Sequence, residues 1–284
     1  MNREQLRTFR EIFEDDMNNG GFVWRHQMYV HVDFQQFWLL AVWPRVSGQG
    51  NLFDVHFGIF LMNSLDPEKI KLIHTGHLLS LSERFGEGSS GYISNAGELW
   101  NTVENYRYVF NVFQHKASPI FHGIRSTGDA LDFRLTHACL PIETEEMEFI
   151  VGRHLVELLI YLHRDEEIPE IIRRIKSLLC YRIERDRQNP IVYQNPVILG
   201  CSPKQAERHV SLAKKEYVAR LAARDKRERG YSETQMAIDL LEHTLQTVDH
   251  TEIAAVVYNN MKRVSDNLQK QFSKSEIIMM RTKW

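Results

Sequence analysis

The chain is poor in cysteine and has no long apolar segment. Its 284 residues include three cysteines, an odd number, and no two of them have a CxxC spacing. The disulfide framework of a secreted protein usually has an even number of cysteines, so we expect a reducing, cytoplasmic environment. Residues 1–17 lack the apolar stretch of a signal peptide. The most apolar stretch, residues 34–46, is broken by polar side chains and is too short to span a bilayer, so we predict no membrane association.

Motifs that bind phosphate or support hydrolysis are also missing from the sequence. The 15 glycines form neither a GxGxxG nor a GxxxxGK[ST] pattern, and GxSxG and HExxH do not occur. Nucleotide-dependent and common hydrolytic chemistries are therefore disfavoured, whereas a metal nuclease with scattered carboxylates stays open. His74 and His77 have a spacing that suits a metal if the segment is helical, but a structural zinc needs four ligands. We predict neither a metal nor another cofactor.

An excess of one charge is lacking as well. The chain has 35 basic and 37 acidic residues, so its overall charge gives no reason to expect that the whole protein binds a polyanion. Apolar residues make up 43% and charged residues 25%, the normal balance for a folded protein. A chain of this length buries enough surface to fold without disulfides or metals.

The first 140 residues predict helices around an antiparallel sheet. Residues 3–17 place apolar side chains on one helix face, and the glycines at 20 and 21 end that helix. Period-two alternation or a run of apolar residues predicts three strands, joined by short connections as an antiparallel meander: residues 22–32, 34–46 and 52–62. Residues 98–115 have helical spacing, and residues 131–140 fit a strand or a helix.

From Pro141 the pattern is helical almost to the end of the chain. Gly230 is expected to end one of these helices, and Ser232 begins a capping-box pattern for the next. The predicted helices cover residues 143–163, 168–187, 203–229, a segment from 232, and a segment from 251. We therefore predict an α+β fold: an N-terminal antiparallel sheet with flanking helices in residues 1–140, followed by an all-helical C-terminal domain in residues 141–284.

Residues 22–113 contain three segments that resemble an uncharacterised bacterial α+β domain family found near toxin–immunity and defence loci. The segments are GFVWRHQMYVHVDFQQF at 21–37, LFDVHFGIFL at 52–61, and the helix opening GELWNTVENY at 97–106. They are patterns of aromatic and strand residues, and the stretch 22–113 covers about a third of the chain. The resemblance implies an α+β fold and a binding role such as toxin neutralisation. It implies no active-site residue.

Polar side chains on one side of the predicted sheet form the first candidate site. Four of them share a parity on the first strand and two share the polar side of the third, so we expect them to converge: Arg25, Tyr29, His31, Asp33, Asp54 and His56. Such a group suits a protein partner. A solvated face, which an open antiparallel sheet needs, explains the same pattern. Imidazole beside carboxylate is also the arrangement of a catalytic base, so an enzyme centred on His31, Asp54 and His56 is a third possibility.

A basic segment, residues 204–229, forms the second candidate site. It holds nine Lys or Arg residues against four acids, a net charge of +5. Basic side chains along a helix can neutralise phosphates and release their counterions. The residues that would do so are Lys214, Lys215, Arg220, Arg224 and Arg227. A solvated helix face, with its acids in helix ion pairs, is the alternative.

The sequence leads to a functional hypothesis in two forms. The first is a non-catalytic cytoplasmic interaction protein, such as an immunity protein that masks a basic toxin, because residues 1–141 are acidic, with 12 basic and 15 acidic side chains. The second is a nucleic-acid-associated bacterial defence component that uses residues 204–229. An apolar stripe from Val257 to Leu268 spans under two heptads, so packing within the chain is favoured, and a homodimer through these C-terminal helices stays open.

Overall fold

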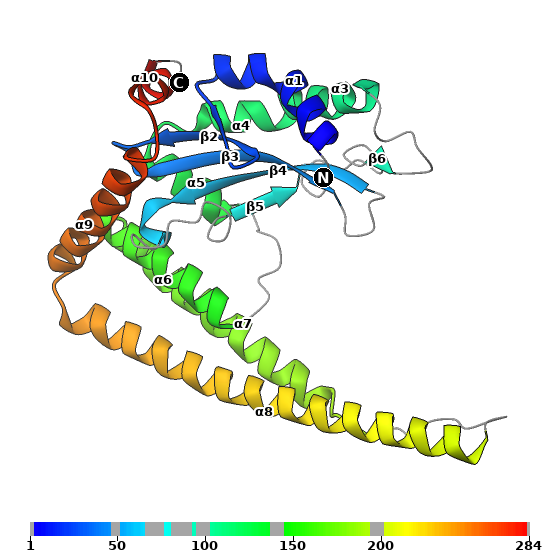
Figure 1. Cartoon of the computed structure of the whole chain (residues 1–284). Helices are drawn as coiled ribbons and strands as arrows, with labels where there is room; N and C mark the ends of the chain where they lie inside the picture. Colours follow the sequence, from blue (N-terminus) through cyan, green and yellow to red (C-terminus); the bar gives the residue numbers. More distant parts are fainter. Residues whose placement is uncertain are drawn as a thin grey trace. The chain divides into compact units, whose positions relative to one another are not determined.

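The computed structural model describes residues 3–46, 52–65, 77–80, 93–94, 103–136, 145–193 and 202–282, with backbone alone for residues 45–46, 52–54, 77–80, 93–94, 105 and 145–148. Its contacts divide the chain into two units. Unit 1 comprises Met1–Pro141 and Ala254–Trp284, and unit 2 comprises Ile142–Ile253. Unit 1 contains the sheet and unit 2 is helical (Figure 1), so the α+β prediction is confirmed.

The predicted domain boundary describes where unit 2 begins but not where it ends. Residues 254–284 belong to unit 1, not to a helical domain that runs to the end of the chain. The reason is the buried stripe of α9 (His250–Gln269), which contains Val257, Met261, Val264 and Leu268. Next to this stripe, the Ser265 hydroxyl donates to the Phe34 carbonyl oxygen, and the Tyr258 ring meets Phe37 at a centroid distance of 5.7 Å. The stripe is therefore buried by packing within the chain.

Unit 1 is built on an antiparallel sheet that has six strands in the described residues, in the order β1-β2-β3-β4-β5, with β6 also paired to β4. The strands are β1 (Val23–Arg25), β2 (Met28–Asp33), β3 (Trp38–Val46), β4 (Leu52–Leu61), β5 (His77–Ser80) and β6 (Ile93–Ser94). The first helix, α1 (Arg3–Asn19), precedes the sheet as predicted. It ends where Gly21 adopts a φ of 72°, a conformation that glycine reaches at low cost.

The predicted first strand is in fact a hairpin. His26 and Gln27 have φ values of 48° and 65°, as a two-residue type I′ turn requires, and Arg25 pairs with Met28 across it. Cross-strand partners point to the same face of a sheet, so Arg25 shares a face with Met28 and not with Tyr29. The turn therefore reverses the parity that the alternation from 22 to 32 predicted.

Helices cover one face of this sheet. The face contains Tyr29 and His31 on β2, with Phe57 and Ile59 on β4. It packs against α1, α3 (Val103–Val112) and α4 (Ser118–Gly123); a π-helical turn, Phe113–Ala117, joins the last two. The ring of Phe57 meets Phe121 of α4 at a centroid distance of 5.5 Å. Aromatic packing therefore fixes these helices to the sheet.

Two further parts of unit 1 pack against individual strands. The segment at 131–140, which fitted either a strand or a helix, is helical in α5 (Thr127–Thr136), and residues 137–140 lie outside the described chain. α5 packs against β4. The last helix, α10 (Lys274–Thr282), packs against β2, where the Val32 backbone N–H points to the Met280 sulfur at 3.3 Å. α10 therefore covers the part of β2 that extends past the short strand β1.

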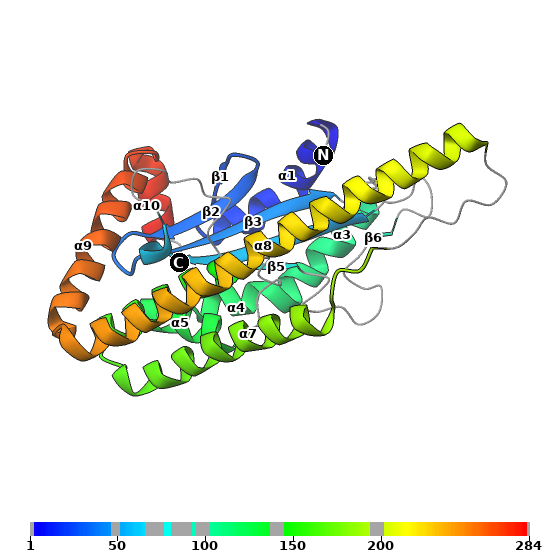
Figure 2. The same cartoon turned by 90° about the horizontal axis from the view of Figure 1, so that it is seen from below.

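Unit 2 consists of α6 (Glu145–Tyr161), a short 3-10 turn (Asp165–Glu167), α7 (Ile168–Gln188) and α8 (Pro203–Thr247). α6 and α7 approach closely at Gly152, where a Cβ atom would lie 2.2 Å from Cδ1 of Ile175. α8 begins with a capping box formed by Ser202 and Gln205, as Ser at the predicted N-cap suggested. Its 45 residues make it about 67 Å long, against about 31 Å for α7, so it extends past α7 (Figures 1 and 2).

Gly230 does not end a helix. α8 continues through it, so the third and fourth predicted helices are one element. A glycine inside a helix costs only about 1 kcal/mol relative to alanine, and the packing of Tyr231, Thr234 and Ile238, all buried, outweighs that cost.

Candidate functional site

The six sheet residues that the sequence grouped do not form one face. The strand register places Tyr29, His31 and Asp33 on the helix-covered face, and it places His56 on the opposite face, paired with Trp43. Arg25 lies on the face opposite Tyr29 because of the hairpin turn. The backbone of Asp54 pairs with Arg45, on the same side as His56, and its side chain lies outside the description. The predicted convergence is therefore wrong, and His31 and His56 cannot share a catalytic pocket.

His31 is a buried structural residue. It is 1% exposed, and its Nδ1 lies 3.1 Å from the carbonyl oxygen of Gly21, an acceptor, so Nδ1 carries the proton. Its ring stacks on Trp38 at a centroid distance of 5.4 Å. Burial lowers the pKa of His31 to about 4, although the hydrogen bond to Gly21 and the charge of Asp33 oppose that change. His31 is therefore neutral at pH 7 and inaccessible to a partner.

The other residues of this group are also engaged within unit 1. The Tyr29 hydroxyl donates to the Arg10 carbonyl oxygen at 2.9 Å, and burial raises the pKa of this phenol. Asp33 Oδ1 accepts from the backbone N–H groups of Gln35 and Gln36, so it shapes the β2–β3 turn. His56 is 3% exposed. The burial of Tyr29, His31 and His56 leaves no continuous polar surface for a partner on these strands.

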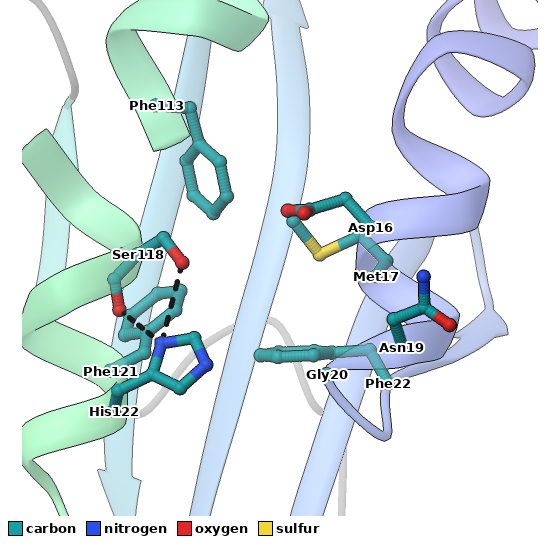
Figure 3. A pocket seen from close by; sticks show the side chains of 9 residues that line it. All are labelled: Asp16, Met17, Asn19, Gly20, Phe22, Phe113, Ser118, Phe121 and His122. Carbon is teal, nitrogen blue, oxygen red and sulfur yellow. Dashed lines mark hydrogen bonds between the residues drawn. The ribbon is translucent and has the colours of Figure 1, made fainter. Parts of the chain in front are cut away.

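A hollow of about 170 Å³ lies between α1 and α4 in unit 1 (Figure 3). Ser118 and His122 of α4 face Asp16 of α1 across it. This set suggests a nucleophile with its base, but the hydrogen bonds exclude that pairing. His122 Nδ1 lies 2.8 Å from the carbonyl oxygen of Ser118, which only accepts, so Nδ1 is protonated and cannot take a proton from the Ser118 hydroxyl 3.4 Å away.

A buried cation in unit 1 has two nitrogen atoms without a hydrogen-bond acceptor among the described residues. Arg134 of α5 is 3% exposed, and its Nε and Nη1 have no hydrogen-bond acceptor. Burial lowers the pKa of Arg134 to about 10, so the side chain is still charged at pH 7. Asp129, on the same helix, instead accepts from the Arg125 backbone N–H and the Ser126 hydroxyl. An unpaired buried charge is a cost to the fold, so Arg134 offers a test of stability.

Metal ligands do not gather in the described part of the chain. Among residues whose side chains are described, no group of three or more His, Cys, Asp or Glu could hold a metal ion. The candidate pair His74 and His77 lies outside this statement, because the structure does not describe the side chains at these two positions.

The basic segment 204–229 forms the N-terminal half of α8, and three of its five predicted residues are already paired. Arg220 binds Glu216 at 2.5 Å, and Arg224 binds Glu228 at 2.8 Å, each one helix turn away. Arg227 binds Asp186 of α7 at 3.0 Å. Although burial opposes the change, hydrogen bonds from Tyr231 and Arg227 lower the pKa of Asp186. These three arginines therefore stabilise the helix and its packing on α7.

Five other cations of this segment lie along one line on the helix. With 3.6 residues per turn, they fall within a sector of about 60° around the helix axis. They are Lys204, Arg208, Lys215, Lys226 and Arg229, and we call them the basic face. All five are exposed, and none forms an ion pair with another part of the described chain. The other positions in this sector up to Arg229 are Ser211 and Ala222, so the line contains no acid.

The basic face points away from the side of α8 that packs. The half-buried residues of the same segment lie on the opposite side of the helix: Ala206, Val210, Ala213, Tyr217 and Leu221. Lys214, which the sequence placed beside Lys215 as a candidate, lies about 100° away from it around the axis. The sequence prediction therefore missed Lys204, Arg208, Lys226 and Arg229, which helical periodicity over residues 204–229 would have aligned.

Positive charge extends over the end of the hairpin that α7 and α8 form. Residues 182–229, from the last two turns of α7 to the middle of α8, hold 12 Lys and Arg against six Asp and Glu. The complete chain is near neutral, so the rest of it is acidic. Such an asymmetry concentrates the positive potential at one end of unit 2.

Comparisons with protein-family models, curated proteins and solved structures gave no match to this chain. In the residues that the structure describes, every helix is too short or too polar to cross a lipid bilayer.

Proposed function

We propose that the protein binds nucleic acid through the basic face of α8. The observation that supports this proposal is the line of five exposed, unpaired cations from Lys204 to Arg229. At 1.5 Å per residue the line is about 37 Å long, and it contains no acid and no large apolar side chain. A linear array of one charge sign matches a linear polyanion, because each cation can neutralise one phosphate and release its counterion.

The paired arginines make the basic face available. Glu216, Glu228 and Asp186 are held by Arg220, Arg224 and Arg227, so these acids are not free to pair with the cations of the basic face. The two pairs within α8 have i,i+4 spacing, which adds to the stability of the exposed helix. The helix therefore presents the basic face to solvent with these three acids already paired, and the two remaining acids of the segment, Glu207 and Asp225, lie outside the line.

The other functional predictions from the sequence stay predictions. Toxin neutralisation rested on a polar sheet face, and the described side chains form no such face. A role in bacterial defence and a cytoplasmic location remain compatible with nucleic-acid binding, but no described contact bears on them.

The test is the dependence of binding on salt. A fluorescent 20-base-pair DNA duplex is titrated with the protein at several KCl concentrations, and binding is followed by anisotropy. Five phosphate contacts predict a slope of log K against log salt of about −4.5. The triple variant Lys204→Gln, Lys215→Gln, Lys226→Gln is expected to bind at least about tenfold more weakly at low salt, with a slope of about −1.8.

A matched control carries the same change in charge outside the basic face. The variant Arg174→Gln, Arg187→Gln, Lys214→Gln also removes three exposed cations from unit 2, but none from the line and none from the ion pairs that hold Glu216 and Glu228. It is expected to keep most of the affinity and most of the slope. Equal losses in the two triple variants, with both folded by circular dichroism, would contradict the proposal. So would a wild-type protein that shows no salt-dependent binding.

A further inference from the structure

The basic face has two ends, and their spacing suits a double helix. Lys204 and Arg208 form one cation pair, and Lys226 and Arg229 form another. Their midpoints are about 32 Å apart along the helix axis, and Lys215 lies between them. One strand of B-DNA returns to the same side of the duplex every helical turn, about 34 Å. The two cation pairs are therefore spaced like phosphates of one strand on one side of a duplex.

The basic face lacks what a single strand needs. Proteins that bind single strands combine a basic groove with aromatic rings on which bases stack. The sector from Lys204 to Arg229 contains no aromatic residue. Tyr217 lies on the opposite side of α8, where its ring meets Tyr193 at a centroid distance of 5.5 Å. Bases of a strand bound along the basic face could not reach it.

The helix keeps the spacing fixed. α8 is one uninterrupted helix from Pro203 to Thr247, so both cation pairs lie on the same rigid element. A rigid ligand loses little conformational freedom on binding, whereas a single strand that followed this straight line would have to be ordered along it. Because α8 and a duplex are both rigid, the basic face favours a duplex over a single strand.

We infer that the basic face binds the backbone of a nucleic-acid duplex, with its two cation pairs contacting phosphates one helical turn apart. This inference rests on the proposed function and adds the class of ligand and the length of its site. The contacts are to phosphates only, so binding is independent of sequence. A duplex shorter than the distance between the two pairs can contact only one of them at a time.

The test compares three DNA probes: a 16-base-pair duplex, a single strand of 16 nucleotides, and a hairpin with a stem of eight base pairs. The short stem is about 27 Å long, less than the span of the two pairs. Two variants are used, Lys204→Gln with Arg208→Gln and Lys226→Gln with Arg229→Gln. On the 16-base-pair duplex each is expected to lower the affinity about tenfold. On the short stem each is expected to lower it by no more than about twofold, because the remaining pair provides an equivalent site.

The outcomes separate this inference from the proposed function. If the single strand binds as tightly as the 16-base-pair duplex, the duplex inference is overturned while nucleic-acid binding stands. The same conclusion follows if each variant loses as much affinity for the eight-base-pair stem as for the 16-base-pair duplex. If none of the probes binds in a salt-dependent way, both proposals fail. Tighter binding to the long duplex, with variant effects that depend on length, supports both.

Discussion

Arg25 and Glu276 are 251 positions apart in the sequence, and the Arg25 Nη2 donates to a Glu276 carboxylate oxygen at 2.6 Å. The bond ties β1 to α10 within unit 1. The Glu276 carboxylate also accepts from the backbone N–H and the hydroxyl of Ser273, the residue before α10, so the two residues form a capping box at the start of that helix. Although burial opposes the change, these hydrogen bonds, together with the charge of Arg25, lower the pKa of Glu276.

Glu276→Gln is therefore expected to lower the free energy of unfolding by about 1 kcal/mol, since Arg25 is partly exposed and the ion pair is partly screened. Urea unfolding at low and high salt is the measurement, and the loss should shrink as salt is added. Glu233→Gln, at an exposed position of α8, is the matched control and should change stability by less than about 0.5 kcal/mol. Equal effects of the two substitutions would remove the role given to this ion pair.

His31 predicts a loss of stability in mild acid. Its pKa is about 4 in the folded protein, below the value of about 6.5 for an unfolded chain. Between these two pH values the unfolded state binds a proton that the folded state does not, so stability falls as pH falls from about 6.5 toward 4. Through His31 alone, the free energy of unfolding is expected to be about 2 kcal/mol lower at pH 5 than at pH 7. Unfolding in urea at both pH values is expected to show this loss in the wild type and to lack it in His31→Phe; the same loss in both proteins would refute the assignment.

Two glycines in helices of unit 2 should respond in opposite ways to the same substitution. A Cβ at Gly152 would lie 2.2 Å from Cδ1 and 2.6 Å from Cγ1 of Ile175, whereas a Cβ at Gly230 meets nothing within 4 Å. Gly152→Ala is expected to lower stability by about 1–3 kcal/mol through overpacking. Gly230→Ala is expected to raise it by about 0.5–1 kcal/mol through helix propensity. Chemical denaturation of both variants is the measurement, and Ile175→Ala should cost less when it is combined with Gly152→Ala than alone.

Arg134 predicts a gain in stability when its charge is removed. Its guanidinium is buried, and two of its nitrogen atoms lack an acceptor in the part of the chain that the structure describes. Methionine has a similar length and no charge, so Arg134→Met is expected to raise the free energy of unfolding by about 1–3 kcal/mol. Arg174→Met, at an exposed position of α7, should be nearly neutral. Thermal and urea unfolding measure both. A destabilised Arg134→Met protein would show that the guanidinium is satisfied in solution.

The helices of this fold could be predicted well because their apolar stripes repeat at helical spacing over many residues. The hairpin at His26 and Gln27 could not, since type I′ turns are usually marked by Asn-Gly or Asp-Gly and this one is not. The continuity of α8 was hidden by two local signals at Gly230 and Ser232 that resemble a helix end and a helix start. Packing of the following residues overrides both signals.

The candidate sites show the same limit. His31 and Tyr29 were assigned to a polar face by their side-chain type, but the backbone carbonyl oxygens of Gly21 and Arg10 satisfy their polar atoms and allow burial. The positive charge of residues 204–229 was visible in the sequence. The sequence did not show which of these cations are unpaired, because Arg227 binds Asp186 on another helix, 41 positions earlier.

The division of unit 1 between two stretches of sequence sets an order of events on the ribosome. Val32 and Phe34 are synthesised before unit 2, while Met280 and Ser265, which cover them, are synthesised after it. All of unit 2 is translated in the interval. The sheet must therefore persist with an uncovered edge until all of unit 2 and the helices that follow it have been translated, and an uncovered sheet edge exposes the nascent chain to aggregation and to chaperones.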